Sequence, residues 1–117
     1  MDAIDAVLVE IGHGTCRIRA THSQSISAEA RKKLRAVVGH PERVPLEKLG
    51  ELDTLLGRDF AAAANELIRL SGEDRQAIRA IGSHGQTVFH SPRGPAPFTM
   101  QLGDANLIAE QTGLTTV

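Results

Sequence analysis

Residues 46–71 carry the stretch that decides the fold, LEKLGELDTLLGRDFAAAANELIRLS. Its apolar side chains recur every three or four residues, at Leu49, Leu52, Leu56, Phe60, Ala63, Leu67 and Leu70. This spacing places them in one stripe along a helix, and the alanine run after Phe60 has high helix propensity. A stripe of this length predicts a helix that covers one face of a β-sheet.

The residues before this helix predict a β-hairpin and a shorter helix. Residues 3–11 form a β-branched apolar run, and residues 16–21 alternate between apolar and polar side chains. Both are expected as strands, joined by a turn at Gly12-His13-Gly14. A third short strand is expected over residues 21–26. Ser27 is a suitable N-cap for a helix over residues 28–38.

The residues after the long helix predict strands that alternate with loops and a helix. A strand is expected at 77–82, a polar loop at 83–87, a second loop at 91–97 and a strand at 98–102. A helix is expected at 105–111, and residues 114–117 begin another strand. A hairpin followed by helices that alternate with strands predicts an α/β fold, with a mixed β-sheet covered by helices.

The composition argues against two classes of partner. The net charge is −1 and the aromatic residues are three Phe, without Trp or Tyr, so neither a basic surface nor stacking platforms for nucleic acid are expected. No apolar run approaches the ~20 residues of a membrane span. The single cysteine, Cys16, allows no disulfide within the chain, which fits the cytoplasm.

A polar loop at residues 83–87 is the first candidate site. Ser83, His84, Gln86 and Thr87 surround Gly85, which permits a positive φ angle or a close backbone approach. Ligands of open α/β sheets bind beyond the carboxyl ends of strands, and this set of neutral donors and acceptors suits a polyhydroxylated ligand. A polar turn that satisfies its own hydrogen bonds is the alternative, and composition does not choose between them.

The second candidate site follows the strand at 98–102. Gln101 and Asp104 flank Gly103 at the start of the expected helix, where free backbone N–H groups are available. Asp104 is expected to cap this helix, to hold a sugar hydroxyl, or to do both.

No standard metal or nucleotide motif is visible. The five histidines are scattered without the spacing of zinc ligands, so no metal site is expected. Neither a Gly-x-Gly-x-x-Gly nor a P-loop pattern occurs. A bound nucleotide would therefore be held by another device.

Several segments together resemble the anhydro-N-acetylmuramic acid kinase family. They are Ile81-Gly82-Ser83-His84-Gly85-Gln86-Thr87-Val88, then Phe98-Thr99-Met100-Gln101-Leu102-Gly103-Asp104, then Ile108-Ala109-Glu110-Gln111-Thr112-Gly113-Leu114-Thr115, with Leu52-Asp53-Thr54-Leu55-Leu56-Gly57-Arg58 upstream. The resemblance spans essentially the whole chain, and the Gly-Ser-His-Gly-Gln-Thr segment with its Gln-x-Gly-Asp continuation is specific to this family.

The resemblance implies a fold and a reaction. The family belongs to the sugar kinase/Hsp70/actin superfamily, whose ribonuclease H-like fold has two lobes with ATP bound between them. It opens the anhydro ring of a cell-wall sugar with water and phosphorylates the sugar with ATP and Mg²⁺. The product is N-acetylmuramic acid 6-phosphate, an intermediate of peptidoglycan recycling. From their position in the two loops and their side-chain chemistry, Ser83, His84, Gln86, Thr87, Gln101 and Asp104 are expected around the sugar.

The resemblance also places the ends of the chain within a larger pattern. The family's first strand precedes a phosphate-binding hairpin, and residues Met1, Asp2, Ala3, Ile4 and Asp5 match the second part of that hairpin. They are expected near the ATP phosphates, although two acids near a terminus mean little alone. Residues 1–117 are thus expected to be an incomplete N-terminal lobe, truncated at both ends. The general base of the family lies in the second lobe, so no catalytic residue is expected here.

Two functions compete at this point. One is a piece of the kinase that has no activity of its own and binds neither ATP nor Mg²⁺ tightly. The other is a non-catalytic module that uses the same loop to bind a sugar. The strand at 3–11 is expected to expose one unpaired edge, which makes self-association a further prediction.

Overall fold

The computed structural model describes residues 3–117, so Met1 and Asp2, two of the five residues expected at the ATP phosphates, lie outside the described residues. The helices and strands of this range are β1 (Ala3–Gly12), β2 (Thr15–Ser25), α1 (Ala28–Gly39), α2 (Leu46–Ser71), β3 (Gln86–Ser91), β4 (Phe98–Leu102) and α3 (Ala105–Thr112). Short 3₁₀ turns lie at Pro41–Arg43 and Arg75–Ala77. The predicted α/β class is confirmed. Within residues 3–117 the named strands form two antiparallel pairs, β1–β2 and β3–β4.

Strands β1 and β2 form the predicted hairpin. Their register runs from Ala3 opposite Ser25 to Gly12 opposite Thr15, with an irregularity between Leu8 and Val9. The separate third strand expected over 21–26 is wrong, because residues 21–25 simply continue β2 along its partner. Their backbone groups continue the hydrogen-bonded ladder with β1, so they do not form a separate strand.

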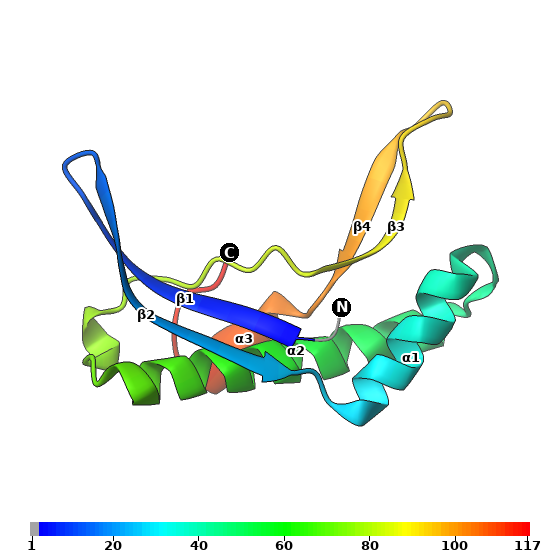
Figure 1. The fold of residues 1–117 in the computed structure, drawn as a ribbon. Coiled ribbons are helices and arrows are strands. Elements are labelled where there is room, and N and C mark those ends of the chain that lie inside the picture. Colours follow the sequence, from blue (N-terminus) through cyan, green and yellow to red (C-terminus); the bar gives the residue numbers. More distant parts are fainter. Residues whose placement is uncertain (1–2) are drawn as a thin grey trace.

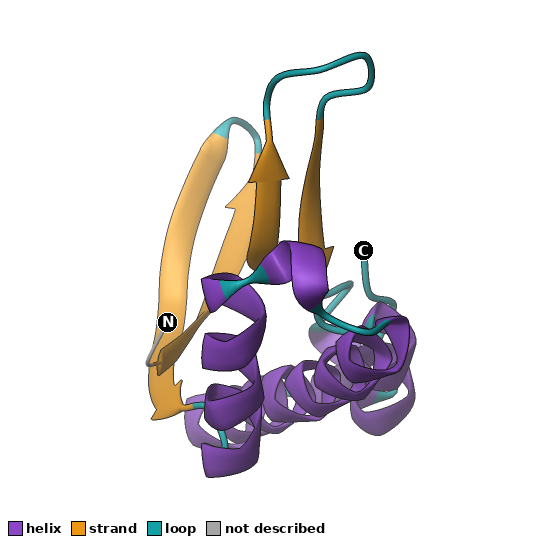
Figure 2. Ribbon diagram, turned by 90° about the vertical axis from the view of Figure 1, so that its right-hand side faces the viewer, coloured by secondary structure: helices purple, strands orange, loops and turns teal. Residues whose placement is uncertain are grey.

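Helix α2 is the platform on which the other elements lie. Figure 2 shows the strands in one layer above the helices, and in Figure 1 the tips of the two hairpins point away from each other, to opposite sides of the molecule. The predicted stripe is largely confirmed, with Leu52, Leu56, Ala63 and Leu67 all buried. Leu70 is 54% exposed, whereas Ile68 is buried. The last turn of α2 therefore turns a different face inward than the stripe predicted.

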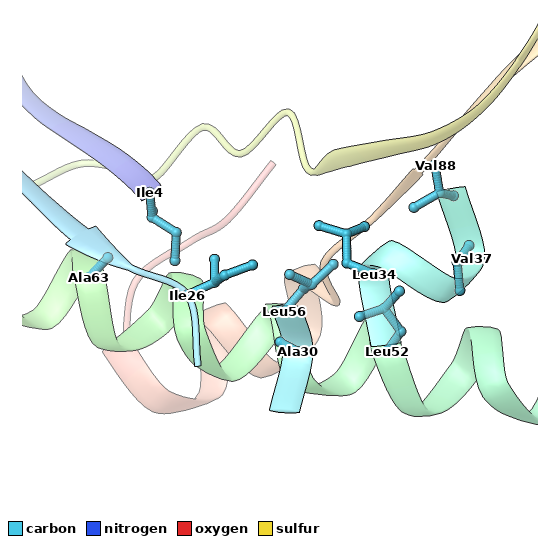
Figure 3. Close-up of a cluster of buried hydrophobic side chains, with 9 residues drawn as sticks. All are labelled: Ile4, Ile26, Ala30, Leu34, Val37, Leu52, Leu56, Ala63 and Val88. Carbon is cyan, nitrogen blue, oxygen red and sulfur yellow. The ribbon is translucent and has the colours of Figure 1, made fainter. Parts of the chain in front are cut away.

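A cluster of nine buried apolar side chains joins the layers (Figure 3). Its members are Ile4, Ile26, Ala30, Leu34, Val37, Leu52, Leu56, Ala63 and Val88. They come from β1, the β2–α1 connection, α1, α2 and β3, so a single apolar contact region ties both hairpins to the helices. Glu51 of α2 accepts hydrogen bonds from Lys33 Nζ of α1 at 2.6 Å and from Lys48 Nζ of its own helix at 2.7 Å. The bond to Lys33 adds a polar contact between α1 and α2. These two hydrogen bonds lower the pKa of the Glu51 carboxyl to about 2.

The strand expected at 77–82 is reduced to a single parallel bridge between Ile81 and Thr116. Ile81 N–H donates to the Thr115 carbonyl at 2.8 Å, and Val117 N–H donates to the Ile81 carbonyl at 2.9 Å. The second expected strand, 114–117, is represented by the same bridge. The two segments share only three backbone hydrogen bonds, between residues 81–83 and 115–117, so their pairing is too short for a full ladder.

Residues 86 and 87 also differ from expectation. The polar loop predicted at 83–87 ends at Gly85, because Gln86 and Thr87 already belong to β3. A polar sequence can form a strand when a partner is present, and β4 supplies that partner. No helix within residues 3–117 is both long and apolar enough to cross a membrane.

Candidate functional site

Gly85 brings the first candidate loop against the end of β4. Its φ angle is +65°, and a Cβ at this position would lie 2.8 Å from the Leu102 carbonyl oxygen. Both properties expected of this glycine, a positive φ and a close backbone approach, are therefore present. Any other residue would push the loop away from β4.

The β3–β4 pairing places three of the predicted sugar-binding residues next to one another. Gln86 lies opposite Leu102, and Thr87 lies opposite Gln101. Thr87 and Gln101 are exposed, and the Gln86 side-chain amide donates to the Thr87 carbonyl at 2.8 Å. The base of this hairpin thus presents hydroxyl and amide groups to solvent on adjacent strands, which is the chemistry a hydroxylated ligand requires.

Asp104 is the N-cap of α3. Its carboxylate accepts the N–H of Asn106 at 2.8 Å and the N–H of Leu107 at 3.4 Å. The capping role predicted for Asp104 is confirmed. A contact with a sugar hydroxyl stays a prediction, and it would have to use the lone pairs that these two bonds leave free.

Asp53 of α2 holds the second candidate loop in place, and sequence reasoning missed it. Its side chain accepts the Gly103 N–H at 2.7 Å, and its backbone carbonyl accepts the Asp104 N–H at 3.2 Å. We call this pair of bonds the Asp53 clasp. In the sequence, Asp53 is simply an acid next to Leu52 of the apolar stripe. An acid that faces solvent gives the same pattern, so the sequence does not reveal the role of Asp53.

Two glycines allow the loop to sit this close to α2. Gly103 has a φ of +131°, and a Cβ there would overlap the ring of Phe60. On the helix, a Cβ on Gly57 would lie 2.9 Å from the Asp104 carbonyl oxygen. The 103–104 turn therefore packs directly on the backbone of α2, with Phe60 beneath it.

A cavity of about 1180 Å³ lies between β1, α2 and residues 77–86. Ala3, Ile4 and Asp5, expected near the ATP phosphates, line it together with the predicted sugar residues Ser83, His84 and Gln86. Thr87, Gln101 and Asp104 are not among the lining residues. Ile4 is 9% exposed and belongs to the core cluster, so its side chain serves packing.

The far end of this cavity carries an ion-pair network. Arg19 of β2 donates to Glu73 at 3.0 Å and to Glu10 at 3.4 Å. The hydrogen bond to Glu73 is the main reason that the pKa of Arg19 is raised. In the part of the chain that the structure describes, no three His, Cys, Asp or Glu side chains are grouped closely enough to hold a metal ion.

The comparisons with known proteins agree with one another. The sequence model of a family described as anhydro-N-acetylmuramic acid kinase matches residues 1–117. The anhydro-N-acetylmuramic acid kinase of Xanthomonas oryzae pv. oryzae (strain MAFF 311018) is 48% identical over 119 residues, which cover 99% of this chain and 32% of the relative. That of Vibrio vulnificus (strain CMCP6) is 46% identical over 117 residues, which cover 100% of this chain and 31% of the relative. The chain spans about a third of the length of the curated relatives it matches.

Proposed function

The chain belongs to the anhydro-N-acetylmuramic acid kinase family, and on this premise we propose that it forms the sugar-binding part of such a kinase. The reaction is the ATP-dependent opening and phosphorylation of 1,6-anhydro-N-acetylmuramic acid. It yields N-acetylmuramic acid 6-phosphate for peptidoglycan recycling in the cytoplasm. The relatives that carry this name align with 99–100% of the chain, and the alignment with the Vibrio vulnificus kinase covers every candidate site residue.

One observation carries the proposal: the base of the β3–β4 hairpin carries neutral polar groups on paired strands and is tied to α2 by hydrogen bonds. Gln86, Thr87 and Gln101 lie on paired strands, and the Asp53 clasp fixes the turn that follows. A sugar is recognised by donors and acceptors in fixed positions. We assign these side chains, with Ser83 and His84 beside them, to the sugar hydroxyls and the N-acetyl group.

The ATP side of the site is represented by Ala3, Ile4 and Asp5. Asp5 is exposed and lines the cavity. Mg²⁺ is commonly held by one or two carboxylates together with substrate phosphates and water, so a single carboxylate fits a metal ion that arrives with ATP. In this role Asp5 would hold the ion while the backbone of residues 3–5 faces the phosphates.

We further propose that the 117 residues alone transfer no phosphate and bind ATP and Mg²⁺ only weakly. In the family, the general base belongs to a second lobe, and closure of two lobes around the substrates is what excludes water from a kinase site. The test is ADP release by the purified chain with ATP, Mg²⁺ and the anhydro sugar. No sugar-dependent release is expected, and a measurable sugar-dependent rate would contradict the proposal.

The sugar assignment is tested in a longer relative such as the Vibrio vulnificus kinase. Alanine at the positions aligned with His84 and Gln86 should lower kcat/KM for the sugar by roughly tenfold or more, because each removes a hydrogen bond to substrate. Alanine at the position aligned with Gln76, in the 3₁₀ turn at the other end of the cavity, is the control. Unchanged kinetics in the first two variants would remove these residues from the sugar site.

A further inference from the structure

The side chains of the β3–β4 hairpin divide between two faces. Residues opposite each other on paired strands share a face, and so do residues two apart along one strand. Thr87 lies opposite Gln101, and His90 lies opposite Thr99. The residue that interrupts this register, Val88, belongs to β3, so the alternation along β4 is unbroken. Thr87, His90, Thr99 and Gln101 therefore share one face, and we call these four exposed residues the polar strip.

The apolar side chains of the hairpin lie on the other face. The rings of Phe89 and Phe98 pack edge to face, with their centroids 5.3 Å apart. Leu102, which shares this face with Phe98 and Met100 along β4, packs against the core cluster. This separation of apolar and polar side chains agrees with the register. The outer part of the hairpin projects away from the helices (Figure 1), so the polar strip faces solvent along its length.

The polar strip continues beyond the residues already assigned to the sugar. Thr87 and Gln101 lie at the base of the hairpin, and His90 and Thr99 follow toward its tip. We propose that His90 and Thr99 bind the carboxylate of the lactyl ether, the group that distinguishes a muramic acid sugar from a glucosamine sugar. This assignment rests on the proposed function, and it makes His90 and Thr99 residues that determine which sugar is accepted.

His90 and Thr99 form a pair that always has a hydrogen-bond donor to offer. Their Nδ1 and Oγ1 atoms are 2.9 Å apart. A neutral imidazole carries one N–H and a threonine carries one O–H, and one of these two protons lies in the bond between them. The other proton is available to a ligand, as Nε2–H in one tautomer and as the Thr99 O–H in the other. A carboxylate therefore finds one donor in either tautomer, and two when the ring is protonated.

The charges along the hairpin favour an anion near its tip. Residues 86–102 contain no Asp or Glu, and Arg93 lies in the turn between the two strands. Asp104 follows β4 at the base of the hairpin, beyond Gln101. Because like charges repel and opposite charges attract, a carboxylate on the polar strip is directed away from Asp104 and toward Arg93. The sugar is thereby oriented with its lactyl arm toward the tip and its ring toward the base.

The spacing of the polar strip fits the dimensions of this sugar. Thr99 and Gln101 are two residues apart on β4, which corresponds to roughly 7 Å along the strand. An ether oxygen and one carbon separate the lactyl carboxylate from the ring, so with ordinary bond lengths the arm extends about 4–5 Å from the ring. A ring over Thr87 and Gln101 therefore brings the carboxylate within hydrogen-bonding distance of His90 and Thr99.

The test titrates the 117-residue chain with 1,6-anhydro-N-acetylmuramic acid and, separately, with 1,6-anhydro-N-acetylglucosamine, which lacks the lactyl ether. NMR follows the backbone amides and the imidazole resonances of the five histidines. Both sugars should shift the amides of Thr87 and Gln101. Only the muramic acid sugar should shift the imidazole of His90, while His13, at the tip of the other hairpin, serves as an internal control that responds to neither.

The possible results separate this proposal from the proposed function. If both sugars shift Thr87 and Gln101 but His90 does not respond, or responds equally to both, the lactyl assignment is wrong and the sugar site stands. If neither sugar shifts any of these resonances, the sugar site itself is wrong and the lactyl assignment falls with it. A His90 response to the muramic acid sugar alone supports both.

A matched pair of variants measures the contribution of the carboxylate contact. Thr99→Val and Thr87→Val each remove one exposed hydroxyl from the polar strip and keep a β-branched side chain. The unaltered chain should bind the muramic acid sugar about tenfold or more tightly than the glucosamine sugar, because a hydrogen bond to a charged group is a strong one. Thr99→Val should lower this ratio by about threefold or more, whereas Thr87→Val should weaken both sugars by the same factor and keep the ratio.

His90→Phe extends this comparison, because it keeps a ring and removes both nitrogens. It should bring the ratio of the two affinities close to one. A ratio that stays the same in Thr99→Val and in His90→Phe would contradict the assignment. Circular dichroism checks that each variant folds, and the comparison of the two sugars on the unaltered chain decides the question if a variant does not.

Discussion

The two hairpins of this chain share a plan and differ in how they are attached to α2. Each is an antiparallel pair with one irregularity in its register, between Leu8 and Val9 in one and between Thr87 and Phe89 in the other. Both hairpins pack into the apolar cluster, through Ile4 and Val88, but the base of β3–β4 is also attached through the Asp53 clasp and close glycine contacts. The β1–β2 hairpin is attached through apolar packing at Ile4 and an exposed ion pair.

This difference fits the sugar-binding role proposed for the β3–β4 base. A binding site needs side chains held to within a fraction of an ångström, which directed hydrogen bonds and backbone contacts provide. Apolar packing fixes where a strand lies without directing individual polar groups. Changing one attachment at a time tests whether this contrast between the hairpins holds.

The largest effect is expected when the closest contact of the site is broken. Gly103→Ala should cost roughly 3–5 kcal/mol of folding stability, because it combines backbone strain at a positive φ with displacement of the Phe60 ring. Gly94→Ala, at the tip of the same hairpin, is the control, since its φ is +110° but no atom lies within 4 Å of the added Cβ. It should cost only the strain, about 1–3 kcal/mol. Urea unfolding followed by circular dichroism measures both, and equal losses would show that the Phe60 contact contributes nothing.

The second-largest loss of stability is expected when the Asp53 clasp is removed. Asp53→Ala leaves the Gly103 N–H without its acceptor, at a cost of about 1–3 kcal/mol. Asp59→Ala is matched to it, because Asp59, also on α2, accepts the Ser27 N–H at 2.8 Å away from the site. Both variants should lower the urea midpoint, but only Asp53→Ala should shift the backbone amide resonances of Gln86 and Gln101. The same shifts in both variants would mean that the clasp does not position the site in particular.

The contact between α2 and the 103–104 turn predicts opposite signs for two helix glycines. Gly57→Ala should destabilise the fold by about 1–2 kcal/mol, because the new Cβ would meet Asp104 backbone atoms at 2.9–3.0 Å and the helix-propensity gain does not offset this. Gly50→Ala has open space around its Cβ and should stabilise the fold by about 0.5–1 kcal/mol. Thermal unfolding of the two variants gives the signs directly. Stabilisation by both would show that the turn can move away from α2 at no cost.

The sequence predicted features that are encoded within one segment and missed features that depend on contacts between distant segments. Local patterns predicted the helices and the β1–β2 hairpin, because the spacing of apolar residues and caps such as Ser27 are encoded within each segment. The strand at 77–82 was overestimated, because an extended apolar segment becomes a ladder only where neighbours pair with it. Strand β3 was missed along its whole length, Gln86–Ser91, because its partner β4 lies across a loop.

The candidate site shows the same limit. Its polar residues could be named from the sequence because their chemistry stands out against the surrounding strands. The residues that hold them could not, because nothing in the helical pattern of α2 distinguishes Asp53, which binds a distant backbone N–H, from an acid that faces water. Gly57 likewise gives no sign of the turn packed against it.

The smallest effect is expected at the polar attachment of the β1–β2 hairpin. Arg19 and Glu73 are bonded at 3.0 Å, but their side chains are 50% and 37% exposed, so solvent and salt screen their attraction. Arg19→Gln should therefore lower the urea midpoint only slightly at low ionic strength, and the difference should vanish at about 1 M salt. Asp53→Ala, in contrast, should keep its deficit in high salt, because it removes a partly buried hydrogen bond to a backbone group. If Arg19→Gln proved as costly as Asp53→Ala and equally insensitive to salt, the two hairpins would be attached with equal strength. The hydrogen-bonded attachment of the β3–β4 base would then not distinguish the site.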